Sequence, residues 1–285
     1  MRFRFITIAL FALLIAANAA ADTTYRPFVL ASVSEDGLEA RTNATLEALK
    51  DAGFSIAGTH GPVEDSLVIV ATSDELLAVA AASDRGGYAA AQRISVTEVA
   101  YVNPLYLQYA YRLEADMQPV ADALAGALGS VETFGSEKGL TAKKLGKYNY
   151  MIGMQKFDDP SELGSFGSFD EAVAAVSAGL AQQGDALTQV YRIDIPGKQQ
   201  AVIGVAMKAT DEEEQPIDEA FQLSIVDFEG NAKTAYFPYE ILVNGGEVEA
   251  LHMRFRMAVH FPDLPMMGAH GFTKLMSSPG AGKTA

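Results

Sequence analysis

The sequence contains no cysteine in its 285 residues. This absence excludes disulfide bonds, a lipid-modified cysteine, a thiol nucleophile, zinc–thiolate sites and cysteine-ligated iron–sulfur clusters. A small extracellular scaffold would need disulfides, but a chain of this length can bury a core without them. Apolar residues make up 49% of the chain, which also excludes an intrinsically disordered protein.

Basic residues are scarce, with 21 Lys and Arg against 36 Asp and Glu and a net charge of −15. Such a charge opposes binding to nucleic acid or to an anionic membrane surface. Long apolar runs are absent beyond the first 21 residues, because Asp74 and Glu75 interrupt the run from Leu67 to Ala82. We therefore expect a soluble product with no membrane span and with the solvated acidic surface of many secreted proteins.

The N-terminal segment has the pattern of a secretory signal peptide. Arg2 and Arg4 precede an apolar run that ends near Ala16, and small residues follow up to Ala21. The apolar run is too short to cross a bilayer, and the small residues are typical of a cleavage site. The pattern predicts a periplasmic or secreted protein cut near Ala21. Cleavage would leave 19 basic and 36 acidic residues, a net charge of −17.

The remaining pattern predicts an α+β fold of two related modules, each a small, mostly antiparallel sheet covered by helices. Both halves show the order helix, glycine, strand, turn, strand: 44–50, Gly53, 54–59 and 67–72 first, then 170–182, Gly184, 187–195 and 201–208. The expected organisation is a signal peptide (1–21), a first module (22–128), a connecting region (129–168), a second module (169–276) and a flexible tail (277–285).

Several further elements are expected in these modules. Helices are expected at 74–82, 105–113, 116–128 and 169–182. Apolar runs predict strands at 27–33, 92–102, 146–157, 221–228, 235–243 and 248–261, and residues 158–168 are turn-forming. The tyrosines between Tyr101 and Tyr111 have a helical spacing that favours a core or module interface over a pocket lining.

Part of the first half resembles a known family. The helix end Ala-Leu-Lys-Asp-Ala-Gly-Phe (48–54), the apolar strand 67–72, Arg93-Ile-Ser-Val-Thr, and Ala-Tyr-Val-Asn-Pro-Leu-Tyr (100–106) resemble the DUF302 family over about residues 28–113. The resemblance implies a small α+β domain without a settled biochemical activity, so no catalytic residues carry over. The second half lacks the Asn-Pro element, and Phe261-Pro262 is at best its remote counterpart.

The last expected strand carries the preferred binding site. Alternation along 251–261 places Leu251, Met253, Phe255 and the following apolar residues on one face. The other face then carries four basic or imidazole side chains: His252, Arg254, Arg256 and His260. Guanidinium groups there would suit a carboxylate or another anion. The alternative is that these cations pair with carboxylates of the protein's own neighbouring strands.

The same region raises a metal hypothesis. Thioether and imidazole ligands suit copper, and the candidate ligands are His252, His260, Met266, Met267 and His270. Met253 and Met257 lie on the apolar face of the expected strand, where methionines fill cores. The acidic run 211–214, with Asp218 and Glu219, is a weaker calcium candidate. It lacks the ligand spacing of a calcium loop, so a solvated loop is favoured.

Motifs for catalysis are missing from the sequence. It has no G-x-S-x-G and no H-E-x-x-H, and Gly280 to Thr284 is not expected to form a phosphate loop, because Ser277 stands where that motif needs a glycine. His60 and Asp65 in a turn are too common a combination to count as an acid–base pair. The sequence therefore favours non-catalytic binding of a small anionic or amphiphilic ligand, or of a protein partner. The alternatives are copper or other cation binding, and a hydrolase or isomerase whose site is assembled from distant residues.

Overall fold

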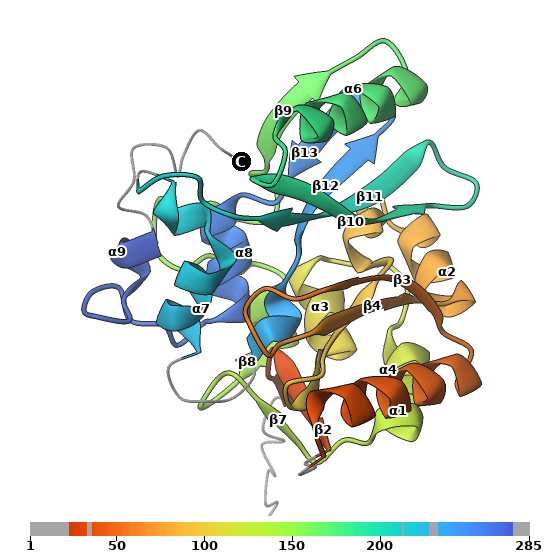
Figure 1. Cartoon of the computed structure of the whole chain (residues 1–285), viewed down its shortest axis with the longest axis vertical. Helices are drawn as coiled ribbons and strands as arrows, with labels where there is room; N and C mark the ends of the chain where they lie inside the picture. Colours follow the sequence, from red (N-terminus) through yellow and green to blue (C-terminus); the bar gives the residue numbers. More distant parts are fainter. Residues whose placement is uncertain (1–22, 33–35, 213, 228–232, 276–285) are drawn as a thin grey trace, which may run out of the picture.

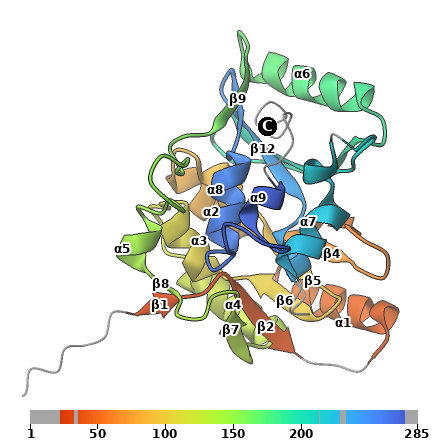
Figure 2. The same cartoon turned by 90° about the vertical axis from the view of Figure 1, so that its left-hand side faces the viewer.

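The computed structural model describes residues 23–32, 36–212, 214–227 and 233–275. The expected signal peptide and the expected C-terminal tail lie outside these ranges. The described chain forms antiparallel sheets of six, five and two strands, with helices around them (Figures 1 and 2). The α+β class predicted from the sequence is therefore confirmed. No helix within the described ranges is both long and apolar enough to span a bilayer.

The first module contains the six-stranded sheet, in the order β3-β4-β5-β6-β2-β7. Its strands are β2 (Phe28–Ser32), β3 (Ser55–His60), β4 (Val68–Thr72), β5 (Gln92–Ser95), β6 (Val99–Val102) and β7 (Glu132–Phe134). Its helices are α1 (Leu38–Asp51), α2 (Asp74–Ala82), the 3-10 turn η1 (Gly86–Ala89), α3 (Pro104–Ala110) and α4 (Gln118–Leu128). Helices α1 and α4 pack side by side at the bottom of Figure 1.

The second module contains the five-stranded sheet, in the order β10-β11-β12-β13-β9. Its strands are β9 (Ser161–Ser165), β10 (Leu187–Asp194), β11 (Gln200–Met207), β12 (Tyr239–Asn244) and β13 (Glu247–Ala250). Its helical segments are α6 (Phe169–Gln182), η2 (Gln215–Ile217), α7 (Glu219–Val226), η3 (Lys233–Tyr236), α8 (Met253–His260) and α9 (Phe272–Leu275). A short ribbon of β1 (Thr24–Tyr25) and β8 (Leu140–Thr141), followed by α5 (Ala142–Leu145), completes the described chain.

The two large sheets share one topology. Strands β3-β4-β5-β6-β2 and β10-β11-β12-β13-β9 follow in the same spatial order, and β7 is an addition to the first sheet. Helices α1 and α6 follow the first strands, η1 and η3 precede the equivalent strands β5 and β12, and α3 and α8 follow β6 and β13. The prediction of two related modules is thus confirmed. Two parts of the expected connecting region, β7 and β9, belong to the sheets.

Local sequence explains why the helices start where they do. The Ser73 hydroxyl accepts a hydrogen bond from the Leu76 N–H at the start of α2, and Ser168 does the same for the Glu171 N–H of α6. Acidic residues fill the first turn of both helices, where they complement the helix dipole. Helix α6 then buries Ala172, Val173 and Leu180 against the outer face of the five-stranded sheet (Figure 1).

The two modules interlock through their 3-10 turns. Turn η1 of the first module packs against β11 and β12, and turn η3 of the second packs against β5 and β6. The Gly87 N–H donates to Gln200 Oε1 at 2.8 Å, and Arg93 Nε donates to the Ala235 carbonyl at 3.0 Å. A Cβ at Gly87 would lie 2.4 Å from Leu242 Cδ1, so a larger residue here would force the leucine side chain to move. The main core therefore runs without a break through both modules.

Several strand predictions are wrong. Residues 253–260 and 219–226 form helices α8 and α7, and 92–102 forms two strands separated by a turn. Residues 146–157 form no strand, whereas the turn-forming stretch contains β9. For α8 the cause is near-complete burial: seven of its eight residues are buried, the polar Arg256 and His260 among them, and Arg254 is partly exposed. Hydrophobic periodicity then no longer distinguishes a helix from a strand.

Candidate functional site

The predicted cationic face does not exist as one exposed surface. Residues 253–260 form α8, and His252 is its N-cap, with Nδ1 accepting a hydrogen bond from the Arg254 N–H at 3.2 Å. His252 and Arg254 are partly exposed, whereas Arg256 and His260 are completely buried. Burial and the nearby Arg254 lower the pKa of His252, so its imidazole is held neutral. His252 occupies the place that Asn103, the N-cap of α3, has in the first module.

Arg256 is held inside the protein by carbonyl oxygens and aromatic rings. Its Nη2 donates to the carbonyls of Tyr236 and Pro238, each at 2.7 Å. The guanidinium carbon lies 4.1 Å from the Tyr236 ring centroid and 4.7 Å from that of Tyr239, which gives two cation–π contacts. The nearest carboxylate is Glu240, whose Oε2 lies 3.6 Å from Nη2. Arg256 therefore follows the alternative stated in the sequence analysis, in which these cations pair with carboxylates of the protein itself.

A buried ion pair connects the two modules at their centre. Arg93 Nη1 donates to Glu240 Oε1 at 2.6 Å, and both side chains are 1% exposed. The Tyr191 hydroxyl donates to the same Glu240 oxygen at 3.0 Å. Tyr191 reaches this oxygen by lying across Gly204, its cross-strand neighbour on β11. We call the set Arg93, Tyr191, Tyr236, Glu240, Arg256 and His260 the central cluster.

His260 contributes a neutral imidazole to the central cluster. Its Nδ1 lies 2.8 Å from the Arg256 carbonyl oxygen and therefore carries the proton, so Nε2 is the acceptor that faces Arg93 Nη2 at 3.4 Å. Burial, with the charges of Arg93 and Arg256, lowers the pKa of His260 well below its usual value. Both ring nitrogens are used inside the protein, so His260 cannot act as a copper ligand in this structure.

The other predicted copper ligands lie at the two ends of α8: His252 is its N-cap, and Met266, Met267 and His270 lie in the loop after it. Met267 is 76% exposed, while Met266 and His270 are partly buried in the loop between α8 and α9. The described residues contain no group of three or more His, Cys, Asp or Glu side chains that could hold a metal ion. Asp218 caps α7 instead, accepting from the Phe221 N–H at 3.0 Å, and Glu219 is buried. The solvated-loop interpretation is therefore wrong for Glu219.

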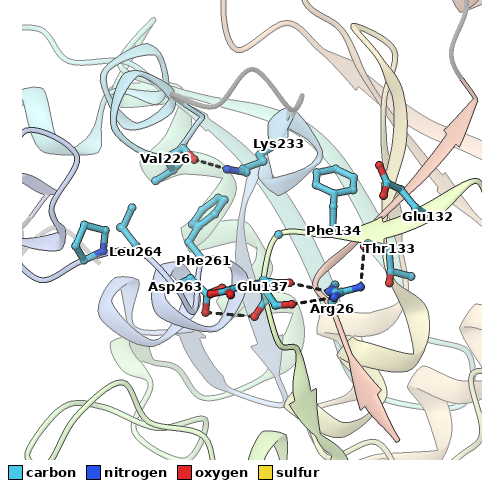
Figure 3. Close-up of a pocket in the computed structure, with 13 residues that line it drawn as sticks. Arg26, Glu132, Thr133, Phe134, Glu137, Val226, Lys233, Phe261, Asp263 and Leu264 are labelled. Atoms are coloured by element: carbon cyan, nitrogen blue, oxygen red, sulfur yellow. Dashed lines mark hydrogen bonds between the residues drawn. The ribbon is translucent and has the colours of Figure 1, made fainter.

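A pocket of about 580 Å³ lies where β7, the start of η3 and the loop after α8 meet (Figure 3). It is lined by Arg26, Glu132, Thr133, Phe134, Gly135, Ser136, Glu137, Val226, Lys233, Phe261, Asp263, Leu264 and Pro265. In Figure 3 the Phe134 and Phe261 rings lie on either side, with Lys233 on one edge and Arg26 on the opposite edge. We call it the aromatic pocket. Its size is typical of small-molecule sites.

The walls of the aromatic pocket are held rigidly. The Phe28 ring lies behind it, 5.4 Å from the centroid of Phe134 and 6.0 Å from that of Phe261. Arg26 donates to the carbonyl oxygens of Ser136 at 2.7 Å and Glu137 at 2.9 Å. Asp263 Oδ2 accepts from the Glu137 N–H at 2.5 Å, so it links the loop after α8 to the segment after β7. The pocket is therefore formed before any ligand arrives.

A second pocket, of about 720 Å³, contains an acid–imidazole pair that sequence reasoning missed. His60 Nε2, at the end of β3, bonds to Glu219 Oε2, the first residue of α7. We call this the His60–Glu219 pocket. The two residues are 159 positions apart, so no local motif could have revealed the pair. The only sequence signal was an isolated histidine followed by Gly61-Pro62.

Comparison with protein-family models finds no match for this chain, and neither curated proteins nor solved structures match it. The resemblance to the DUF302 family stays a prediction. Function must therefore be argued from the geometry of the two pockets and of the central cluster.

Proposed function

We propose that the protein binds a small amphiphilic ligand with an anionic end in the aromatic pocket, without transforming it. The observation that carries this proposal is the pairing of Phe134 and Phe261 with Arg26 across one preformed pocket (Figure 3). An apolar body of the ligand would lie between the two rings. Burial of that apolar area would supply the affinity for the ligand. The acidic protein as a whole does not attract an anion at long range.

Arg26 is the group that would select the anionic end. Its three hydrogen bonds within the described structure go to the carbonyls of Ser136, Thr133 and Glu137, so no carboxylate is bonded directly to it. A guanidinium bonded only to neutral carbonyls can still bind an anionic group at short range, in a pocket where Arg26 and Lys233 face the carboxylates of Glu132, Glu137 and Asp263. The proposed contact differs from the four residues expected from the sequence, while the proposed class of ligand is the same.

Two fluorescent probes test the proposal. The anion 1-anilinonaphthalene-8-sulfonate should bind, and added salt should weaken it more than the neutral analogue N-phenyl-1-naphthylamine. Phe134→Ala should weaken both probes at least about tenfold, because the ring is a wall of the pocket. Arg26→Gln should weaken only the anionic probe.

Phe166→Ala is the matched control, because Phe166 is 39% exposed on the second module and is not part of the pocket. It should leave both affinities unchanged. Equal affinity of wild type and Phe134→Ala for both probes would rule out this site. Circular dichroism on each variant separates loss of the pocket from loss of the fold.

We also infer export from residues 1–21. The support is the sequence pattern alone, namely Arg2 and Arg4, the apolar run and the small residues before Asp22. The intact mass of the protein produced in a host with a secretion pathway tests this inference. A mature chain beginning at or near Asp22 is expected, and an unprocessed chain would contradict it.

A further inference from the structure

The His60–Glu219 pair has the arrangement of a base and the group that holds it. The side chain of Glu219 is 3% exposed and that of His60 is 14% exposed. Glu219 Oε1 accepts from the Met207 N–H at 3.3 Å, while Oε2 contacts His60 Nε2. The carboxylate is thus fixed by the backbone of β11 on one side and orients the imidazole on the other.

The contact with a carboxylate defines the imidazole tautomer. Because the Glu219 carboxylate accepts, His60 Nε2 carries the proton and Nδ1 carries the lone pair. Nδ1 makes no hydrogen bond to the described residues, and it is not among their buried polar atoms without a partner. Since His60 lines the pocket, this lone pair is open to the pocket's solvent.

The charges around the pocket select against anions. Four carboxylates line it: Glu64 on the loop after β3, Asp185 before β10, Asp218 before α7, and Glu219. The ammonium group of Lys208 is the one lysine or arginine charge among the residues that line the pocket. Burial raises the pKa of Glu219 and outweighs its hydrogen bond to His60, as expected for a carboxylate taken out of water. A neutral or cationic molecule is therefore the favoured occupant.

We propose that His60 is a general base, with Glu219 as its positioning residue, in a hydrolytic activity on neutral or cationic esters. Water reaches the partly exposed His60, whereas proton abstraction from carbon would benefit from a closed, dry site. Nδ1 takes a proton from water as the water oxygen bonds to the acyl carbon. The acyl–oxygen bond then breaks, and the imidazolium returns its proton to the departing alcohol oxygen, so that ester and water give acid and alcohol.

The test uses the full chain and three acetate esters: neutral p-nitrophenyl acetate, cationic acetylcholine and anionic acetylsalicylate. The neutral and cationic esters should be hydrolysed faster than by the same concentration of free imidazole, and the anionic ester should not. The rate should rise with pH, as expected for general-base catalysis. His60→Gln should lower the rate at least about 100-fold.

Two further variants separate catalysis from structure. His252→Gln removes another partly exposed imidazole and should leave the rate unchanged. Glu219→Gln keeps a hydrogen-bond acceptor but removes the charge, so it should lower the rate and move the pH profile, which a purely structural residue would not do. If His60→Gln does not fold, carbethoxylation of wild-type His60, located by peptide mapping, should abolish the rate. A rate equal to that of free imidazole, or one that survives loss of His60, would overturn the proposal.

Discussion

Arg93 and Glu240 occupy the same position in the two modules and are bonded to each other at 2.6 Å. The next residues, Ile94 and Ile241, pair with Tyr101 and Ala250, each of which lies two residues before a helix N-cap, Asn103 or His252. The ion pair therefore connects two equivalent positions, one in each module. Its surroundings hold the positive charges of Arg93 and Arg256 against the single negative charge of Glu240, beside a neutral His260.

Replacing Glu240 with Gln should destabilise the protein by about 3–5 kcal/mol, because two buried guanidinium groups would lose their counter-charge. Urea unfolding followed by circular dichroism measures this change. Arg192→Gln breaks an exposed pair with Asp194 and should change stability by about 1 kcal/mol or less. Similar effects of the two variants would mean that the central ion pair is screened by solvent.

Stability should fall in acid through His260. Its folded-state pKa lies well below the unfolded value, so the unfolded chain binds a proton that the folded chain does not. The free energy of unfolding is unaffected by this proton above about pH 6.5. Below that pH it falls by up to about 1.4 kcal/mol per pH unit. His260→Gln should flatten this part of the stability profile, measured by urea unfolding at a series of pH values. An unchanged slope would show that other groups dominate it.

Gly204→Ala should destabilise the protein by about 1–3 kcal/mol through overpacking. A Cβ there would lie 2.0 Å from the Tyr191 ring, so the ring would move and its hydrogen bond to Glu240 would be lost. Gly179→Ala is the matched control, because this glycine of α6 has open space around it and the change should stabilise the helix by up to about 1 kcal/mol. Thermal unfolding of both variants distinguishes the two effects.

The two modules should unfold together. Turns η1 and η3 each pack on the sheet of the other module, and the main core has no boundary between them. Loss of one module would expose the apolar surface of the other, so we expect one cooperative transition. Coincident denaturation curves from far-ultraviolet and near-ultraviolet circular dichroism would confirm this. Two separated transitions would contradict it.

Sequence patterns predicted those parts of the fold that local signals control. Helices 74–82 and 169–182 were predicted with the bounds that α2 and α6 have, and the structure shows a capping serine and acidic first-turn residues at the start of each. The strand at 67–72 was also predicted, one residue longer than β4. The two helices bury one face, so their periodicity carries information, whereas β4 is a buried strand within the sheet that shows as a continuous apolar run.

The candidate sites could not be predicted in the same way. All residues of helix α8 except Arg254 are buried, so the alternation that suggested a strand was a coincidence of composition, and Arg256 and His260 are inside. The residues of the aromatic pocket come from segments as distant as Arg26 and Asp263, and His60 meets Glu219 only after both modules have folded. Such proximity depends on how the modules pack, which spacing along a chain does not encode.

The equivalence of Arg93 and Glu240 limits how the two halves can be recombined. Two copies of the first half, associated in the same way, would bring two guanidinium groups face to face in a dry interior with no carboxylate between them. Such a symmetric pair would carry uncompensated like charges, whereas in the joined chain Glu240 of the second half lies beside both Arg93 and Arg256. The second half thus supplies the counter-charge that the buried arginine of the first half requires.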